Sequence, residues 1–298
     1  MTGRRVAVAT FAALVQAQSV WAHEDGDAVA SAPSSWDGAV MLLLLTAAMM
    51  YLLGTLQLSR RGAHVRTVER AAFWIGWLSM FAAVSPRFDA AAALAFSSHM
   101  AQHELLMLIG TPLMIVGRPI LPWLWALPTR VRPAAAVGLQ SRALSGLWRW
   151  LTLPAIAWAV HGSVVWLWHL PALYEAALES EAIHAAQHAT FVGTAVLFWW
   201  GLIYGRYGRA AYGASALFVF VTMIHTGALG ALFAFSTSSY YPLYIARASA
   251  AGIDPVTDQQ LAGLYMWIPS GMVLTVFGLG LMLAWLSESE RRGLARGR

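Results

Sequence analysis

Seven of the nine histidines lie within or beside apolar stretches of the sequence, where an ionisable side chain is costly and usually has a function. His99 and His103 are four residues apart, as are His184 and His188, so each pair lies on one face of a helix. Imidazole suits copper, zinc, iron and nickel, and thioether sulfur favours Cu(I). The pattern predicts a metal or haem site with these candidate ligands: His99, His103, His161, His169, His184, His188, His225 and Met107.

The chain contains no cysteine. This excludes disulfides, iron–sulfur clusters, thiolate zinc sites and covalent c-type haem attachment. A metal ion or cofactor must therefore be held by histidine, methionine, carboxylate or backbone groups.

The expected enzyme signatures are incomplete. Residues 103–107 (HELLM) begin like a zinc protease motif, but Met107 stands where the second histidine is required. No GxSxG or P-loop sequence is present, so we do not expect an enzyme. Glu104 has three possible roles, namely a partner of a metal-binding histidine, a proton-relay group, or a neutral acid hydrogen-bonded to a neighbouring helix.

The composition predicts a membrane protein. The chain is 59% hydrophobic and 11% charged, whereas a soluble domain carries about 25% charged residues. Seven apolar stretches follow the N-terminal region, and most reach the roughly 20 residues that a span requires. The predicted spans are 39–58, 71–86, 91–117, 150–168, 184–204, 213–235 and 260–286.

Charged residues are sorted between alternate loops. Arginines gather in 59–70, 118–149, 205–212 and the C-terminal tail, whereas the other loops and the N-terminal region are mainly acidic. The positive-inside rule then predicts an all-α bundle of seven transmembrane helices with its N-terminus outside and its C-terminus inside. In this interpretation the arginines mark the cytoplasmic side of the membrane and do not form a nucleic-acid-binding surface, so we expect no nucleic-acid partner.

The N-terminal region reads as a signal peptide, so the predicted domains are a signal peptide (1–22), an acidic periplasmic tail (23–38), a transmembrane domain (39–287) and a basic cytoplasmic tail (288–298). The alternative is an uncleaved anchor helix. Cleavage would leave His23 at the N-terminus, where its amine and imidazole could chelate copper(II). The alternative there is an acidic tail without metal.

The predicted orientation places all seven histidines in the outer half of their spans, at a rise of about 1.5 Å per residue. They can converge only if spans three to six are neighbours, which a helix bundle allows. Pro112 and Pro269 are expected to kink their helices. Residues 169–183 are expected to form a short interfacial helix, and Tyr240, Tyr241 and Tyr244 resemble membrane-surface anchors.

Four stretches together resemble the CtaG-type cytochrome c oxidase assembly proteins, which are associated with copper-site assembly in caa-type oxidases. They are HMAQHELLMLIGTPLMIVGRP (99–119), WHLPALYEAAL (168–178), HAAQH (184–188, followed by LFWWGLI, 197–203) and DQQLAGLYMWIPSG (258–271). The resemblance implies a seven-helix protein that helps to deliver or insert copper on the outer face. It places five residues on histidine positions of the family: His99, His103, His169, His184 and His188.

The leading functional hypothesis is a non-enzymatic factor of the bacterial inner membrane that handles copper on the periplasmic side. Its partners would be cytochrome c oxidase subunits, periplasmic copper carriers and the lipid bilayer. Two alternatives are a haem b cytochrome or redox protein, and a proton- or ion-coupled transporter. A further alternative is a scaffold whose histidines only connect helices.

Overall fold

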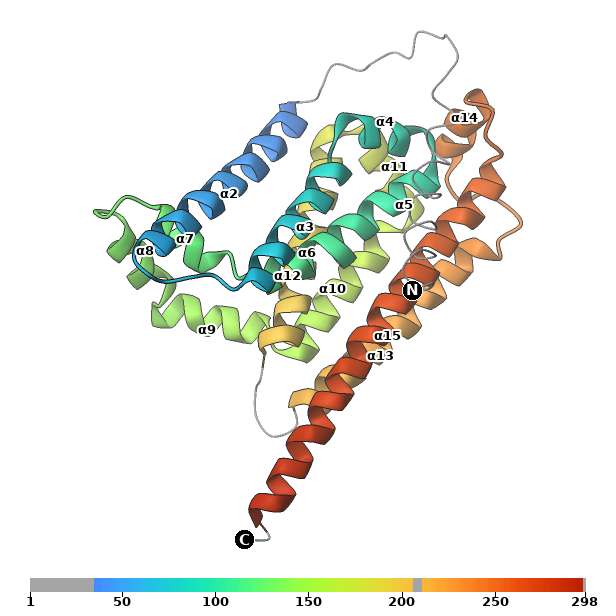
Figure 1. The fold of residues 1–298 in the computed structure, drawn as a ribbon. Coiled ribbons are helices and arrows are strands. Elements are labelled where there is room, and N and C mark those ends of the chain that lie inside the picture. Colours follow the sequence, from blue (N-terminus) through green and yellow to red (C-terminus); the bar gives the residue numbers. More distant parts are fainter. Residues whose placement is uncertain (1–34, 206–210, 297–298) are drawn as a thin grey trace, which may run out of the picture. The chain divides into compact units, whose positions relative to one another are not determined.

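The computed structural model describes residues 35–205 and 211–296, and every regular element within these ranges is a helix (Figure 1). The predicted signal peptide, His23 and nearly all of the acidic tail lie outside the described residues. The predicted all-α fold class is therefore confirmed for the described residues.

The helices follow one another with short connections. In chain order they are α2 (Ser35–Arg60), α3 (Thr67–Ala83), α4 (Pro86–Leu94), α5 (Phe96–Glu104), the π-helix η1 (Leu105–Gly110), α6 (Thr111–Val116), α7 (Ile120–Ala126), α8 (Arg132–Leu139), α9 (Arg142–Leu151), α10 (Pro154–Trp168), α11 (Pro171–Glu179), α12 (Glu181–Tyr204), α13 (Ala211–Ala234), α14 (Pro242–Ala250) and α15 (Pro255–Arg296).

Three helices of the described chain are long and apolar enough to cross a membrane: α2, α13 and α15. Two bent pairs, residues 96–116 with 120–126 and residues 142–151 with 154–168, raise the number to five if each pair is one span. The predicted spans 71–86 and 184–204 coincide with α3 and α12, which do not meet both criteria. Seven spans and the orientation of the termini therefore stay predictions.

The third apolar stretch is interrupted in two places. Ala95 has an extended backbone (φ −128°, ψ 129°) between α4 and α5. The π-helix η1 then follows α5, and Pro112 lies just beyond it. Proline provides no N–H for the preceding turn, and the Thr111 hydroxyl donates to the Leu106 carbonyl at 2.8 Å. π-Helical turns are frequent at functional sites, and this one directly follows Glu104.

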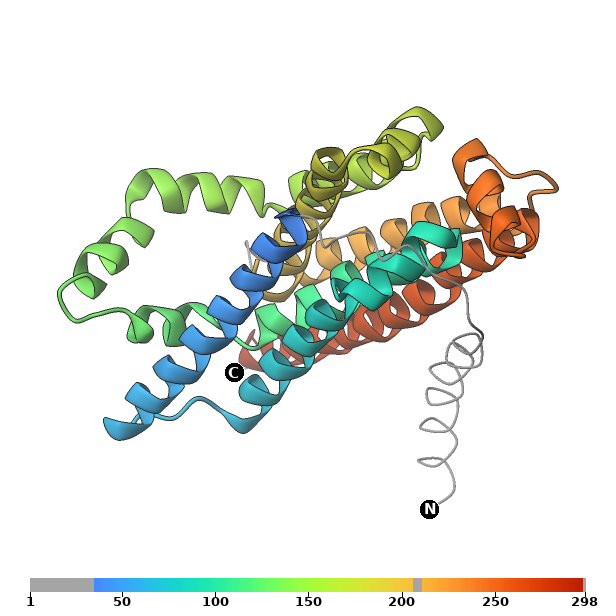
Figure 2. The same ribbon diagram turned by 90° about the horizontal axis from the view of Figure 1, so that it is seen from above.

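Pro269 has a different effect from Pro112. Helix α15 runs through it without a break from Pro255 to Arg296, so it also extends through most of the predicted tail 288–298. The long helices α13 and α15 lie side by side, and α5 packs against α15 (Figures 1 and 2). Helix α10 packs against α12, which places His161 and the pair His184 and His188 in neighbouring helices.

Three short helices, α4, α11 and α14, gather at one end of the described bundle (Figure 1). The predicted helix in 169–183 is confirmed as α11. The Glu175 carboxylate accepts a hydrogen bond from the Leu243 N–H at 3.0 Å, which joins α11 to the start of α14. Arg247 donates to the carbonyls of Ala93 and Leu178, which joins α14 to the other two short helices.

The prediction that Tyr241 and Tyr244 are surface anchors is wrong. Their side chains are 1% and 2% exposed, because α14 folds back and packs them into the aromatic core with Phe96 and Tyr174. Tyr240 is the exposed member of the three.

Helices α2 and α7 cross without space for a side chain at Gly54. A Cβ atom added there would lie 1.8 Å from the Pro122 carbonyl oxygen. We expect Gly54→Ala to lower the stability of the purified protein by about 1–3 kcal/mol, because the backbones must separate. Gly38→Ala in the same helix meets nothing within 4 Å and should be neutral or stabilising, by up to about 1 kcal/mol. Thermal unfolding in detergent measures both, and equal midpoints would contradict the close contact.

Candidate metal centre

The two predicted histidine pairs face each other between α5 and α12. Potential ligand nitrogens of His99, His103 and His188 all lie within 4.8 Å of one another. The ring of His184 joins this group, with its centroid 4.3 Å from that of His188 and 5.4 Å from that of His99. These four residues are named the histidine cluster below.

The spacing of the cluster is close to that of a metal site. Imidazole nitrogens bind transition metals at about 2.0–2.1 Å, so two ligands of one ion lie at most about 4 Å apart. Side-chain movements of about an ångström would bring His99, His103 and His188 onto one ion. Because each ring is on a regular helix, such movements need only side-chain torsions and no change of fold.

An acidic side chain from α15 fixes the start of α5. The Asp258 carboxylate accepts hydrogen bonds from the N–H of Phe96 at 2.6 Å and of Ser97 at 3.3 Å, and also from the Ser97 hydroxyl. The first N–H groups of a helix have no partner within the helix, and a carboxylate there both accepts their hydrogen bonds and opposes the helix dipole. Asp258 is 5% exposed. It is therefore a helix cap that sets the position of His99, not part of a free acidic loop.

Tyr244 holds the ring of His99. Its hydroxyl donates to the Ala92 carbonyl at 2.5 Å and lies 3.1 Å from His99 Nδ1. Because the hydroxyl has one hydrogen, His99 Nδ1 must donate to it. This leaves the lone pair on His99 Nε2, which points to the metal-binding tautomer. A partner on the second nitrogen is the usual way in which proteins orient metal-binding histidines.

The cluster contains buried nitrogen atoms that form no hydrogen bond with the described residues. Within the described residues, no hydrogen-bond partner is found for His99 Nε2, for either nitrogen of His103, or for His188 Nε2. Leaving a buried polar atom unpaired costs about 1–3 kcal/mol, so native proteins rarely do so without a reason. Tyr174 and Phe191 pack against the rings and exclude bulk water from them.

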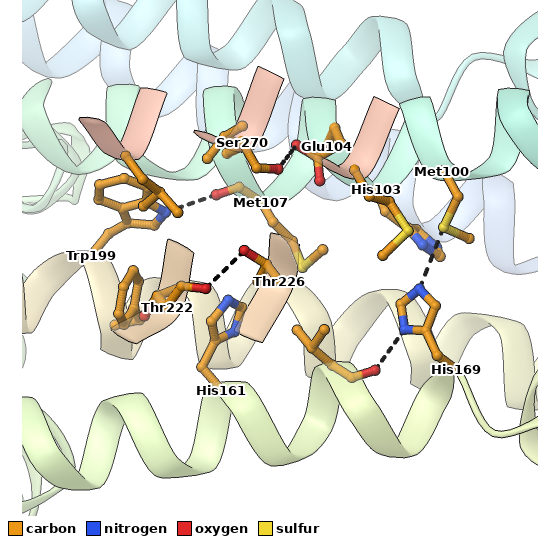
Figure 3. A pocket seen from close by; sticks show the side chains of 15 residues that line it. Met100, His103, Glu104, Met107, His161, His169, Trp199, Thr222, Thr226 and Ser270 are labelled. Carbon is orange, nitrogen blue, oxygen red and sulfur yellow. Dashed lines mark hydrogen bonds between the residues drawn. The ribbon is translucent and has the colours of Figure 1, made fainter. Parts of the chain in front are cut away.

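A cavity of about 60 Å³ adjoins the cluster (Figure 3). Its walls combine imidazole, thioether and hydroxyl groups with one carboxyl, and among its lining residues are Met100, His103, Met107, His161, His169 and Met266. The Ser270 hydroxyl donates to the Glu104 carboxyl at 2.7 Å across this cavity. Glu104 thus has the predicted hydrogen bond to a neighbouring helix, and Met107 lines the cavity next to the cluster.

The structure separates the remaining three histidines from the cluster. His161 Nδ1 lies 3.0 Å from the Thr194 hydroxyl, and the Trp166 indole N–H donates to His225 Nδ1 at 3.4 Å. His169 follows α10 and faces Met100 from the other side of the cavity. The predicted single layer of seven histidines is thus divided, because similar depth in the membrane does not determine the direction in which each helix presents its side chain.

Three residues of this site were not among the sequence candidates: Asp258, Tyr244 and Ser270. Each comes from a segment far from α5 in the sequence and reaches the site only through the packing of α14 and α15. No spacing pattern in the sequence identifies any of the three as part of a metal site.

The comparison with protein-family models gives one match over most of the chain. The model described as cytochrome c oxidase caa3 assembly factor (Caa3_CtaG) matches residues 49–288, which include the histidine cluster, the cavity and Asp258. No curated protein and no solved structure shows a significant match. Since the matched region covers well over half of its length, the chain belongs to the family of cytochrome c oxidase caa3 assembly factors.

Proposed function

We propose that this protein binds copper at the histidine cluster and passes it to cytochrome c oxidase on the periplasmic side of the bacterial inner membrane. The observation that carries the proposal is the convergence of buried, unpaired nitrogens of His99, His103 and His188 within 4.8 Å. Membership in a family of oxidase assembly factors supports cytochrome c oxidase as the protein that receives the copper.

Copper fits these ligands better than the other candidate ions. Among first-row divalent metals, nitrogen sites bind Cu(II) most strongly, and the neighbouring thioethers suit Cu(I). The cluster lacks the carboxylate that magnesium, calcium or manganese would favour. Two axial haem ligands lie on opposite faces of a porphyrin, whereas the ring centroids of His99 and His184 are only 5.4 Å apart, so the arrangement favours an ion over the porphyrin of the haem b alternative.

The predicted orientation supports an outer location for the cluster. Helix α4 packs against α5 and helix α11 against α12, and these two short helices carry Asp89, Glu175 and Glu179. The arginine-rich segment that follows α2 lies away from them (Figure 1). An acidic face attracts metal ions and basic partner surfaces. Copper would enter there, and an oxidase subunit or a periplasmic carrier would exchange it. The protein would act by binding and transfer, without catalysing a reaction.

Oxidase assembly in cells tests this function. Cells that carry His99→Ala/His188→Ala should produce caa3-type oxidase with little copper, because the cluster loses two of its three convergent ligands. His64→Ala is the matched control, since His64 is exposed and lies outside the cluster. The copper content and activity of the isolated oxidase are measured. Fully metallated oxidase from the double variant would refute the proposal.

Tyr244→Phe tests the orientation of His99. Removing the hydroxyl deletes the partner of His99 Nδ1 while retaining the buried ring. Loss of such an outer partner typically weakens metal binding by about 10–100-fold, and we expect about 10-fold weaker copper binding here. Tyr240→Phe, at an exposed neighbouring ring, should bind copper like the parent. Competition titration gives both dissociation constants, and equal values would show that Tyr244 does not orient the ligand.

A further inference from the structure

The cavity contains a contact between two groups that cannot form a hydrogen bond with each other in their neutral forms. His169 Nε2 lies 3.4 Å from Met100 Sδ (Figure 3). On the other side of the ring, His169 Nδ1 lies 2.6 Å from the Val165 carbonyl oxygen. A carbonyl oxygen only accepts, so Nδ1 carries the hydrogen. Nε2 of the neutral imidazole then presents a lone pair to a thioether sulfur that has no hydrogen to donate.

A doubly protonated His169 would allow a hydrogen bond to sulfur, but its surroundings oppose this state. His169 is 8% exposed and Met100 is 1% exposed. No carboxylate of the described residues lies within ion-pair distance of His169. Burying an unpaired positive charge is costly. The arrangement is therefore one of two neutral electron-pair donors that face each other in a buried site.

We propose that Met100 and His169 form a second metal site, specific for a soft monovalent ion such as Cu(I) and separate from the histidine cluster. Ligands at about 2.0 Å (nitrogen) and 2.3 Å (sulfur) from one ion lie about 3.5 Å apart at a tetrahedral angle, close to the observed separation of 3.4 Å. The Val165 carbonyl keeps the ring in the required tautomer, as carbonyl partners do for histidines in established metal sites. Thioether sulfur gives the site its preference for Cu(I) over Cu(II) or zinc.

The position of this site defines a route by which copper could move through the protein. This part of the inference rests on the proposed function. His103 belongs to the cluster and also lines the cavity that contains Met100 and His169. Met107 lines the same cavity and offers another thioether. Copper that the cluster holds as Cu(I) can therefore move to the Met100–His169 site by exchange of ligands at His103, with no change of oxidation state, whereas Cu(II) would stay at the cluster.

Silver(I), which has the ligand preference of Cu(I) and is not oxidised by air, provides the test. The full-length protein in detergent should bind one more Ag(I) per chain than Met100→Leu, which replaces the thioether by an apolar side chain of similar volume. The difference should persist when both proteins also carry His99→Ala/His188→Ala. Met272→Leu is the control, because Met272 is 66% exposed and outside the cavity.

Binding of Cu(II) to the cluster separates the two proposals. Met100→Leu should keep the Cu(II) stoichiometry of the parent, which also shows that the variant is folded. Unchanged Ag(I) binding in Met100→Leu would overturn the second site and leave the cluster intact, whereas Cu(II) binding that is unaffected by His99→Ala/His188→Ala would overturn the cluster. X-ray absorption spectroscopy of the parent protein with Cu(I) tests the site without any variant. We expect a sulfur ligand at about 2.3 Å from the copper. A spectrum without a sulfur ligand would refute the site.

Discussion

The double substitution His99→Ala/His188→Ala should remove one Cu(II) per chain from the purified protein. It deletes two of the three side chains whose nitrogens converge within 4.8 Å, and the remaining cluster imidazoles, His103 and His184, bind a metal ion much less tightly than the full set. We expect the dissociation constant of the cluster to rise by at least 100-fold. Cu(II) titration with a competing chelator and metal analysis after desalting measure the loss.

Two controls make this result specific. First, the parent protein and the double variant should both carry His23→Ala, which removes the imidazole of the predicted N-terminal copper chelate. His64→Ala should retain all of its copper, because this exposed histidine lies in the arginine-rich loop after α2. Equal copper content in the double variant and in His64→Ala would show that the cluster is a structural contact between α5 and α12.

Asp258→Ala should lower both the stability of the protein and its affinity for copper. The carboxylate accepts hydrogen bonds from the buried N–H groups of Phe96 and Ser97, and alanine would leave both without a partner. Loss of a helix cap with buried donors costs about 2 kcal/mol. The start of α5 would also shift, so copper binding at His99 and His103 should weaken along with stability.

Asp254 offers a matched control for Asp258. It lies just before α15 and accepts hydrogen bonds from the Thr257 hydroxyl and N–H, which lower the pKa of its carboxyl; it is exposed, and these hydrogen bonds stay within the start of α15. Asp254→Ala should leave copper binding unchanged. Thermal unfolding and Cu(II) titration of the two variants provide the comparison. An Asp258→Ala protein with the copper affinity of the parent would contradict a positioning role for the cap.

The most predictable part of the site is the part with a regular period. The four-residue spacing of His99 with His103 and of His184 with His188 predicts shared helix faces, and the structure places these faces against each other. The sorting of charge predicts which side of the membrane each helix end faces, and this orientation stays a prediction. Apolar length predicts helices at each of the seven stretches, although it does not establish that each one crosses the membrane.

The remaining features depend on tertiary packing. The sequence places His161 and His225 at the same predicted depth as the cluster, but α10 and α13 direct their rings to Thr194 and Trp166. Tyr244 reads as a membrane anchor in the sequence, and it reaches His99 only because α14 folds back over α5. The π-helix after Glu104 depends on side chains from other helices, such as Trp199, whose indole donates to the Met107 carbonyl at 2.9 Å. These contacts cannot be predicted from the spacing of residues along a single helix.

Electron paramagnetic resonance of the full-length protein carrying His23→Ala, with one equivalent of Cu(II), tests the central claim most directly. In protein labelled with ¹⁵N only at histidine, the hyperfine pattern should change from that of ¹⁴N to that of ¹⁵N, with couplings from more than one imidazole. His99→Ala/His188→Ala should lose this signal. A spectrum that histidine labelling does not alter, or that the double variant retains, would contradict copper binding by the histidine cluster.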